Sequence, residues 1–374
     1  MKALSLFTGA GGADLGITEA GIEVVRGVEW EAPAVATCHA AGLDYVRHGD
    51  VRDLELYEGL PPIDLLFGGP PCQAFSSAGN RQGQDDLDRN GWPWTLDVID
   101  HVEPRWALLE NVPGLLHHSK DCADPCPGCY WTGELLPAFR ARFPWVEHRV
   151  LNASSYGVPQ HRRRVFLVCG PGPIRWPDAT HGDPSTFGQA DLFSRSLRPW
   201  ATVRDALGLE LIAYARGRVD GAVDEVHTGS EPSCALRGSP GGSTQPFAVY
   251  SAGTTGEGRP TAPTATVSGK GTMYLQRPSP SVTAQEVKGT LASAASGFTF
   301  NGGPDRASDA VFMATGRRRL SVAECAILQD FPPGHPFQGT KTAQYRQVGN
   351  AWPRAFGRVL GCAILEADRA REVA

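Results

Sequence analysis

The first 170 residues alternate short apolar runs with helix-like stretches, and this alternation limits the possible folds more than any other feature of the sequence. The apolar runs, which read as buried strands, cover residues 3–7, 22–28, 63–67, 106–109 and 165–168. Helical patterns lie between them at 13–20, 32–41, 96–102 and 135–142. Because strands separated by helices pair most simply side by side, the pattern predicts an α/β fold with a parallel sheet covered on both faces.

A change of composition follows residue 171. Up to residue 305 the chain is rich in Gly, Pro, Ser and Thr, which favours short strands and long loops, with one helix expected over 203–215. Regular patterning returns near 321, and a last helix is expected over 354–369. We therefore predict a catalytic and cofactor-binding domain of residues 1–175, completed by 341–374, and a smaller second domain of residues 176–340.

The composition suits a soluble protein of the cytoplasm. Charged residues make up 20% and hydrophobic residues 41% of the 374, and no apolar run approaches the roughly 20 residues of a membrane span. The first apolar run is too short for a signal peptide, so the nine cysteines are expected to be thiols or metal ligands. The net charge of −5 argues mildly against a nucleic-acid partner, but basic clusters at 161–164 and 317–319 permit a positive cleft.

A glycine loop follows the first strand. Gly9, Gly11 and Gly12 allow a tight turn and the close approach of a ligand. Glu29 closes the second strand, where an acidic side chain can bind ribose hydroxyls, and Asp50 follows the next apolar patch, where it can accept from an adenine amino group. Because the glycine loop, Glu29 and Asp50 follow one another in this order, a nucleoside-binding site is favoured over a loop that only turns the chain. The full G-x-G-x-x-G spacing is missing, which argues against a dinucleotide as the ligand.

The segment G-G-P-P-C-Q, residues 68–73, follows another buried strand. Ligands of parallel sheets bind at the carboxyl ends of strands, so Cys72 is a candidate nucleophile there. Most single cysteines are inert packing residues, but those rarely lie between a diproline and a polar loop. Glu110 ends a further apolar strand at the same edge, where a desolvated carboxyl has a raised pKa; its alternative role is a helix cap.

Two arginines follow in Y-G-V-P-Q-H-R-R-R-V-F, residues 156–166. Alternate residues of an extended segment share a face, so Arg162 and Arg164 are expected to point together. Guanidinium groups suit phosphates and carbonyl oxygens.

These motifs, in this order, resemble the cytosine-carbon-5 DNA methyltransferase family. The resemblance covers residues 3–170 and 317–365, and it includes the segments at 318–332 and 345–351. It implies a Rossmann-like S-adenosylmethionine-dependent methyltransferase fold with a target-recognition domain within residues 176–340. It also implies transfer of a methyl group from S-adenosylmethionine to carbon 5 of a flipped cytosine in double-stranded DNA.

The resemblance assigns roles to individual residues. Cys72 would attack carbon 6 of the base, Glu110 would bind or protonate N-3, and Arg164, with Arg162 in the same site, would hold the base carbonyl. The cofactor pocket would consist of Phe7, Gly9, Gly11, Gly12, Glu29, Trp30, Asp50, Val51, Pro71 and Asn350. The residues expected to contact DNA are Gln73, Ser76, Arg162, Arg237 and Lys270, with Arg259, Arg277 and Lys288 as further basic candidates.

The resemblance has departures and further implications. Trp352 stands where a small aliphatic residue is common, and we expect it to narrow the cofactor end of the site. A monomer is expected, encoded by a bacterium or a phage and belonging to a restriction–modification system. A cognate restriction endonuclease is compatible with this interpretation but is not required as a subunit.

An apparent insertion at residues 117–133 contains three cysteines. Cys122, Cys126 and Cys129 have the C-x3-C-x2-C spacing of the iron–sulfur site in radical S-adenosylmethionine enzymes, but there the motif lies near the first strand of a barrel, and here it lies in a late loop. A structural zinc ion held by the three thiolates with His117 or His118 fits better. Unliganded loop cysteines remain an equal alternative.

Three other functions would each account for part of the sequence. A nicotinamide-linked oxidoreductase would explain the glycine loop but not Cys72, Glu110 or the arginine segment. A catalytically inactive DNA-binding module would predict the loss of Cys72 or Glu110, and both are present. Methylation of transfer RNA, by one branch of the same family, is the closest alternative; the long recognition segments favour DNA.

Overall fold

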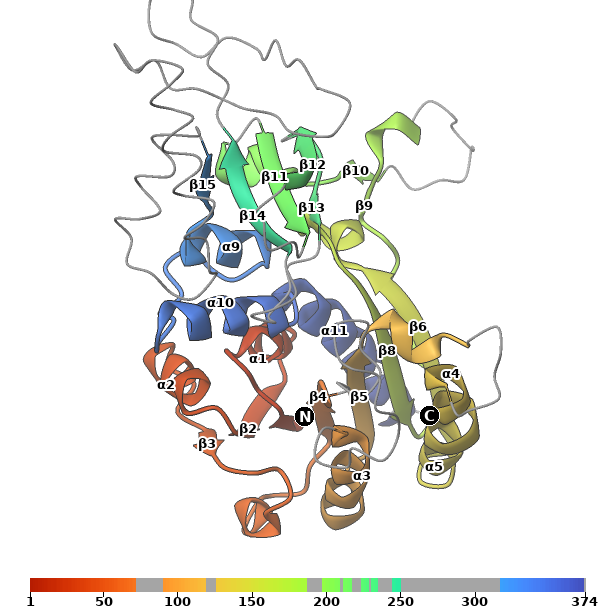
Figure 1. The fold of residues 1–374 in the computed structure, drawn as a ribbon. Coiled ribbons are helices and arrows are strands. Elements are labelled where there is room, and N and C mark those ends of the chain that lie inside the picture. The colour runs from red at the N-terminus through yellow and green to blue at the C-terminus, as the bar shows by residue number, and fades with distance from the viewer. Residues whose placement is uncertain are drawn as a thin grey trace, which may run out of the picture.

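The computed structural model describes residues 1–71, 90–118, 126–186, 197–208, 211–216, 223–228, 230–234, 244–249 and 317–372 (Figure 1). Within these ranges, no helix has both the length and the apolar character needed to cross a membrane.

A seven-stranded sheet in the order β3-β2-β1-β4-β5-β8-β6 forms the centre of the molecule. All five strands expected from the sequence are present, whereas β3 and β6 were not predicted. The bounds are β1 Lys2–Leu6, β2 Glu23–Glu29, β3 Val46–His48, β4 Leu65–Gly68, β5 Trp106–Asn111, β6 Trp145–Asn152 and β8 Arg163–Gly170.

The strand β8 runs antiparallel to both of its neighbours, so the predicted all-parallel sheet is wrong at this position. A parallel connection needs a crossover of a dozen or more residues, usually through a helix. Between β6 and β8 there is only a short turn, made of η6 (Ala153–Tyr156) and β7 (Gln160–His161). The chain therefore folds back, and the first residues of β8 pair with the last residues of β5.

Each face of the sheet has its own apolar core, as the alternation of residues in a strand requires. Leu4, Leu6 and Leu109 face α3 (Gly91–Val102) and the helical run α4 (Pro127–Tyr130), η5 (Trp131–Leu135) and α5 (Leu136–Arg140). Ala3, Phe67 and Leu108 face α1 (Gly12–Glu19) and α11 (Arg354–Glu372). The prediction of a sheet covered on both faces is confirmed.

The helices α1 and α11 lie side by side although they are far apart in the sequence (Figure 1). Glycines make this contact possible. A Cβ on Gly16 would collide with the backbone carbonyl of Arg354, and a Cβ on Gly357 would lie 2.5 Å from the carbonyl oxygen of Ala13. The predicted last helix therefore packs on the first part of the fold.

A second, antiparallel sheet in the order β12-β11-β14-β15 follows in the chain. Its strands are β11 (Leu211–Arg216), β12 (Val223–Thr228), β14 (Thr244–Val249) and β15 (Arg317–Arg319). The helix expected over 203–215 is wrong beyond α6 (Val203–Leu207), because Gly208 ends it at φ +66° and β11 begins soon after. Much of residues 176–340 lies outside the described ranges.

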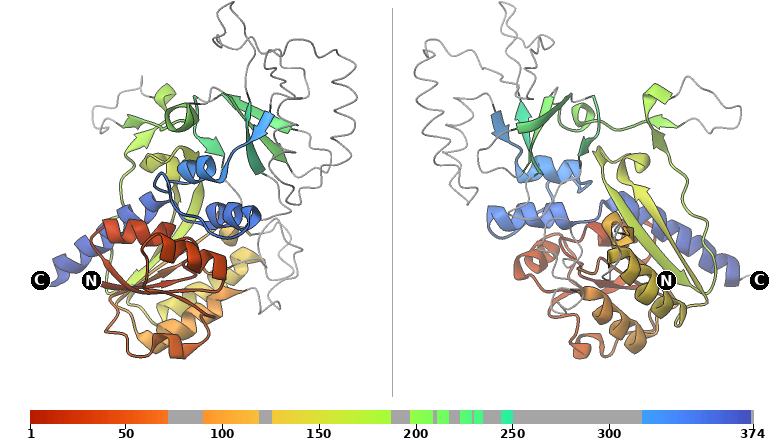
Figure 2. Two further views of the ribbon diagram at one scale, coloured as in Figure 1. Left: turned by 90° about the vertical axis from the view of Figure 1, so that its left-hand side faces the viewer. Right: turned by 45° about the vertical axis from the view of Figure 1, so that its right-hand side comes forward.

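Helices α9 (Val322–Leu328) and α10 (Lys341–Asn350) lie between the two sheets (Figure 2). An apolar cluster there joins Ala10 of the glycine loop to Val203, Leu328 and Val348. This cluster contains residues from both predicted domains. The domain boundaries at 175 and 341 stay a prediction. The remaining elements are α2 (Ala32–Ala40), η1 (Leu54–Tyr57), η4 (Pro113–Leu116), η7 (Pro184–Thr186), β9 (His181–Gly182), β10 (Arg198–Pro199) and β13 (Ser233–Cys234).

Candidate active site

One edge of the central sheet gathers most of the predicted site. The carboxyl ends of β1, β2, β4 and β5 meet there because these strands are parallel, and β8 begins there because it is antiparallel. Ligands of α/β sheets bind at this edge. The glycine loop and Glu29 form one half of the edge, called here the cofactor half. Gly69, Glu110 and Arg164 form the other, called the catalytic half.

The glycine loop has an unusual backbone. Phe7, Gly9 and Gly11 have φ angles of 52°, 59° and 81°, in the left-handed region that side chains other than glycine rarely adopt. A positive φ at a bulky residue such as Phe7 stores strain, which is typical of a ligand-binding turn. The loop leads into α1, which begins at Gly12, so backbone groups and a helix N-terminus line this half.

Glu29 holds the glycine loop in place. One carboxylate oxygen accepts a hydrogen bond from the Gly9 amide and the other from the Glu31 amide, each at 2.7 Å. Burial raises the pKa of this carboxyl, and the backbone hydrogen bonds oppose that rise. Each oxygen has a second lone pair for a ribose hydroxyl. The adjacent Trp30 leaves 68% of its surface exposed, which offers an aromatic face for stacking.

A second buried carboxyl, Asp14, lies below the loop and was not predicted from the sequence. It accepts hydrogen bonds from the Ser5 hydroxyl at 3.1 Å and the Tyr45 hydroxyl at 3.4 Å. Desolvation is the main reason that its pKa rises to about 7, although the Ser5 hydrogen bond opposes the rise. Its position in α1 links the helix to β1.

Three further residues predicted for the cofactor pocket differ in exposure. Asp50 forms a bidentate ion pair with Arg52, whose hydrogen bond lowers the pKa of the carboxyl. Val51 is buried, and its carbonyl accepts from the Tyr57 hydroxyl at 2.8 Å. Asn350 is exposed at the end of α10. Their cofactor contacts stay predictions.

The approach to Cys72 is fixed from both sides. The Pro70 carbonyl accepts from the Asn111 amide at 3.0 Å, and the Pro71 carbonyl accepts from the Gly91 backbone N–H at 2.9 Å. These bonds tie the end of β4 to β5 and α3. Cys72 itself lies outside the described residues, as do the expected DNA-contact residues Gln73, Ser76, Arg237 and Lys270 and the further candidates Arg259, Arg277 and Lys288.

Glu110 and Arg164 meet as a close ion pair. Arg164 Nε lies 2.7 Å from Glu110 Oε1, with side chains only 15% and 12% exposed. Burial raises the pKa of Glu110, while the positive charges of Arg164 and Arg162 act in the opposite direction. The structure thus brings together two residues that the sequence placed in one site, and it gives the carboxyl a pKa shifted toward neutrality.

The sequence did not predict that the side chain of Trp352 lies beside Glu110. Its side chain donates a hydrogen bond to Glu110 and packs against Phe166, with ring centroids 5.4 Å apart. A Cβ on Gly69 would lie 3.0 Å from the indole nitrogen, so a larger residue there would press on the Trp352 side chain. A Cβ on Gly12 would lie 2.4 Å from the backbone carbonyl oxygen of Trp352, so this carbonyl lies against the glycine loop. The structure places the Trp352 side chain beside Glu110, and the narrowing of the cofactor end stays a prediction.

Arg162 points into the protein and is only 1% exposed. One of its terminal nitrogens donates to the backbone carbonyls of Gly349 and Ala351, both at 3.0 Å. In this conformation Arg162 is a positioning residue for the turn between α10 and α11. Its buried side chain does not reach the surface, and a direct contact with DNA stays a prediction.

The cysteine insertion, which follows β5 and η4 in the chain, forms a cluster of its own. The structure brings His118, Cys126 and Cys129 together, with their ligand atoms all within 4.8 Å of one another. Of the two candidate histidines, it is His118 that faces the thiols. Cys122, the remaining predicted ligand, lies outside the described residues.

Comparison with known proteins identifies relatives of this chain. Residues 1–177 and 224–366 match the family of C-5 cytosine-specific DNA methylases. The type II methyltransferase M.NgoMIV of Neisseria gonorrhoeae is 28% identical over 375 residues, which cover 97% of each chain. The type II methyltransferase M.AquIA of Picosynechococcus is 36% identical over 216 residues, 55% of this chain and 87% of that protein.

Solved structures confirm the fold. A mutant of DNMT2 from Spodoptera frugiperda superposes with a TM-score of 0.56 at 15% identity, covering 97% of this chain and 99% of that one. A putative DNA modification methyltransferase from a prophage of E. coli gives a TM-score of 0.56 at 18% identity, covering 99% of both. The Rossmann-like methyltransferase fold is therefore confirmed, and the family match extends over most of the sequence: the chain belongs to the C-5 cytosine-specific DNA methylase family.

Proposed function

We propose that the protein methylates carbon 5 of cytosine in double-stranded DNA through a temporary bond between the Cys72 sulfur and carbon 6 of the base. Membership of the family defines S-adenosylmethionine as the methyl donor and cytosine in DNA as the acceptor. The observation that carries the proposal is the buried Glu110–Arg164 pair beside the fixed Gly69-Pro70-Pro71 segment, which leads directly to Cys72.

The reaction needs a nucleophile because carbon 5 of cytosine reacts poorly within the aromatic ring. When the Cys72 thiolate bonds to carbon 6, the electrons of the 5,6 double bond become available at carbon 5, and N-3 takes up a proton. S-adenosylmethionine supplies a methyl group on a cationic sulfur. Transfer leaves the neutral thioether S-adenosylhomocysteine. Carbon 5 then gives its proton to water, the 5,6 double bond returns as the Cys72 thiolate leaves, and N-3 gives its proton back to Glu110.

Glu110 is suited to donate the proton that N-3 takes up. Burial raises its pKa, so a larger fraction of the carboxyl is protonated near neutrality than in water. Its fixed position comes from Arg164 and the Trp352 indole. We propose that Arg164 donates to the base carbonyl when cytosine enters and that Glu110 then faces N-3.

The residues of the cofactor half fit the donor. The left-handed backbone at Phe7, Gly9 and Gly11 forms a cradle, and Glu29 has free lone pairs for ribose hydroxyls. The exposed Trp30 offers a surface for adenine, with Asp50 at the amino group. The negative charge of Glu29 also favours a ligand with a positive charge, as an ion pair does.

Recognition of the DNA sequence is proposed for residues 176–340. Loops presented on a scaffold commonly carry binding residues, and this region contains the five basic candidates named above. The type II designation of M.NgoMIV and M.AquIA supports a place in a restriction–modification system. The methyl transfer itself needs no endonuclease subunit.

The test is covalent trapping on duplex DNA that carries 5-fluorocytosine in the target site. Fluorine at carbon 5 cannot leave as a proton does, so with S-adenosylmethionine present the wild-type protein should remain attached to the DNA. Cys72→Ala should bind the duplex without forming the adduct, whereas the control Cys362→Ser should form it fully.

Bisulfite sequencing of DNA from cells that express the chain supplies the target sequence needed for the duplex. An adduct that persists in Cys72→Ala would refute the nucleophile. Methyl transfer to transfer RNA in place of duplex DNA would refute the substrate.

A further inference from the structure

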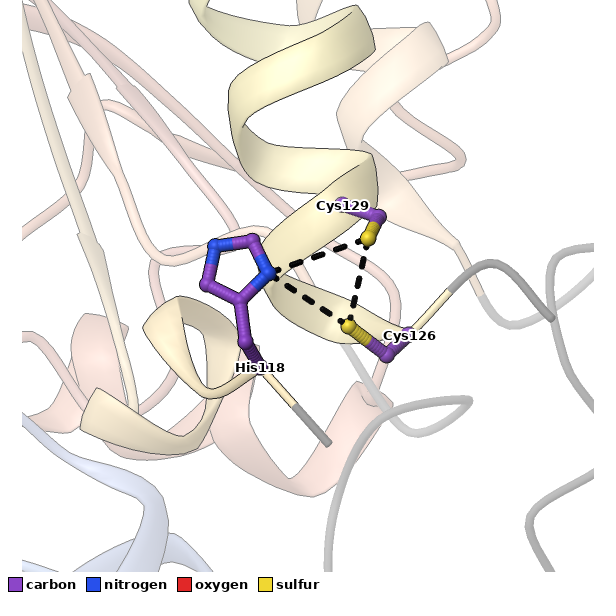
Figure 3. Close-up of side chains that lie close together, drawn as sticks. All are labelled: His118, Cys126 and Cys129. Atoms are coloured by element: carbon purple, nitrogen blue, oxygen red, sulfur yellow. Dashed lines mark hydrogen bonds between the residues drawn. The ribbon is translucent and has the colours of Figure 1, made fainter. Parts of the chain in front are cut away.

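We propose that His118, Cys126 and Cys129 bind a zinc ion that fastens the residue pair after η4, His117 and His118, to the start of α4. Figure 3 shows the imidazole and the two thiols converging on one point. His118 follows η4, whereas Cys126 and Cys129 lie at the N-cap and in the first turn of α4. This site lies apart from the residues proposed for methyl transfer, and its existence does not depend on that function.

The distances agree with tetrahedral coordination. Zinc lies about 2.3 Å from sulfur and about 2.0–2.1 Å from nitrogen, so a tetrahedron places two sulfurs about 3.8 Å apart and sulfur and nitrogen about 3.6 Å apart. Here the two Sγ atoms are 3.5 Å apart, and His118 Nδ1 lies 3.7 Å from each. A disulfide would require about 2.05 Å between the sulfurs, so the two cysteines are not oxidised to one another.

The local sequence builds this arrangement from short-range features. Residues three apart in a helical turn lie on the same face, which aligns Cys126 with Cys129. The Gly128 amide donates to the His117 carbonyl at 3.0 Å and draws the preceding loop onto the helix. A Cβ on Gly128 would lie 2.7–2.8 Å from three atoms of the His118 ring, so only glycine lets the imidazole pack this closely.

Structural zinc sites have four ligands, and the three described residues supply three of them. The sequence prediction names Cys122 for the remaining position, and that residue lies outside the described ranges. The proposal therefore depends on the three residues whose geometry is known, and it selects His118 over His117.

The site lies next to a chain of contacts that leads toward the catalytic half. Tyr130, one residue beyond Cys129, accepts a hydrogen bond from the Asn90 amide at 3.0 Å. Asn90 caps α3 by accepting from the Trp92 amide, and Trp92 packs on Trp131 with ring centroids 6.2 Å apart. A metal that fixes the start of α4 therefore stabilises the corner where the chain returns from the Cys72 segment.

Elemental analysis of the full chain, purified without a chelator or a metal-binding tag, tests the proposal. We expect about one zinc per chain in the wild type. The variants His118→Ala, Cys126→Ser and Cys129→Ser should each lose most of it. His117→Ala and Cys362→Ser are the matched controls and should keep it. Calorimetry with S-adenosylmethionine checks that each variant is folded.

Replacement of zinc by Co²⁺ gives a second measurement that does not depend on activity. The wild type should show thiolate-to-cobalt charge-transfer absorption, and Cys126→Ser should reduce it. The proposal is overturned if the folded wild type binds neither Zn²⁺ nor Co²⁺ at stoichiometric concentration, or if all three ligand variants keep as much zinc as the controls. For Cys122→Ser, loss of zinc supports the predicted fourth ligand and retention overturns that assignment.

Discussion

The two halves of the active-site edge hold their buried carboxyls in different ways. In the cofactor half, Glu29 and Asp14 accept hydrogen bonds from backbone amides and hydroxyls that lie within the first 45 residues. In the catalytic half, Glu110 is held by Arg164 and Trp352, which are far away in the sequence. The first half therefore holds its two carboxyls with neutral hydrogen-bond donors. The second half is charge-balanced, which suits a neutral base that needs a proton.

The largest expected effect tests the catalytic half. Glu110→Gln keeps the shape of the side chain but cannot donate a carboxyl proton, so kcat should fall by about 10²–10⁴, the usual contribution of general acid catalysis. Single-turnover methyl transfer measures the change, with Glu147→Gln, a half-buried residue of β6, as control. Affinity for S-adenosylmethionine should stay within about twofold. A Glu110→Gln rate within tenfold of the wild type would show that the carboxyl is not the acid.

The second prediction tests the protonation of Asp14 through the free energy of unfolding. The pKa of Asp14 is about 7 in the folded protein and 3.8 without burial, so the folded state binds the proton more tightly. This contribution to stability is complete below about pH 4 and is lost as the pH rises toward 7. Asp14→Asn does not titrate. Relative to the wild type, the free energy of unfolding of Asp14→Asn should therefore increase by up to about 4 kcal/mol between pH 4 and pH 8, at 1.36 kcal/mol per pKa unit.

Urea unfolding at several pH values measures this difference. The exposed Asp97→Asn, in α3, serves as the control and should follow the wild-type pH profile. Parallel pH profiles for Asp14→Asn and the wild type would mean that Asp14 remains charged in the folded protein.

The third prediction concerns cofactor affinity. Glu29→Gln keeps one acceptor oxygen for the Gly9 or Glu31 amide but removes the charge and leaves the other amide facing an NH2 group. We expect a loss of about 1–3 kcal/mol in binding of S-adenosylmethionine by calorimetry. Asp50→Asn should lose a similar amount if Asp50 leaves Arg52 to bind adenine. Unchanged affinity in both variants would remove them from the cofactor pocket.

The smallest expected effect tests the hydrogen bond that Trp352 donates to Glu110. Its hydrogen bond lowers the pKa of Glu110, so Trp352→Phe should raise that pKa while the packing on Phe166 is largely kept. Because the protonated carboxyl is the proposed acid, the fall of kcat at high pH should move to a higher pH. Trp176→Phe, far from Glu110 in the sequence and also buried, is a matched control. A downward shift would contradict the assigned hydrogen bond.

The cofactor half was predictable because its parts are local. Glycine loop, strand end and acidic residue follow one another within residues 7–29, and each depends on the type and spacing of neighbouring residues. Asp14 was missed because nothing in G-A-D-L-G distinguishes a buried carboxyl from an exposed residue in the first turn of a helix. Its burial is decided by β1 and Tyr45.

The catalytic half was predictable only in part, because it depends on topology. A parallel β8 would have placed Arg164 at the opposite edge from Glu110, so the two sequence predictions, parallel sheet and shared site, were in conflict. The short connection at residues 153–162, which contains no helix long enough for a crossover, was the available signal. The contact between Trp352 and Glu110 left no sequence signal, since it depends on the packing of α11.

The close packing of α11 on α1 has a consequence for synthesis of the protein. All predicted catalytic motifs emerge from the ribosome by residue 164, yet the helix that covers the face behind the glycine loop begins only at Arg354. Until then, apolar residues such as Ile17 and Phe67 lack their partners on α11. A growing chain must keep this surface from aggregating for most of its translation time. The face of the sheet behind the glycine loop is therefore covered only after residues 354–372 have been made.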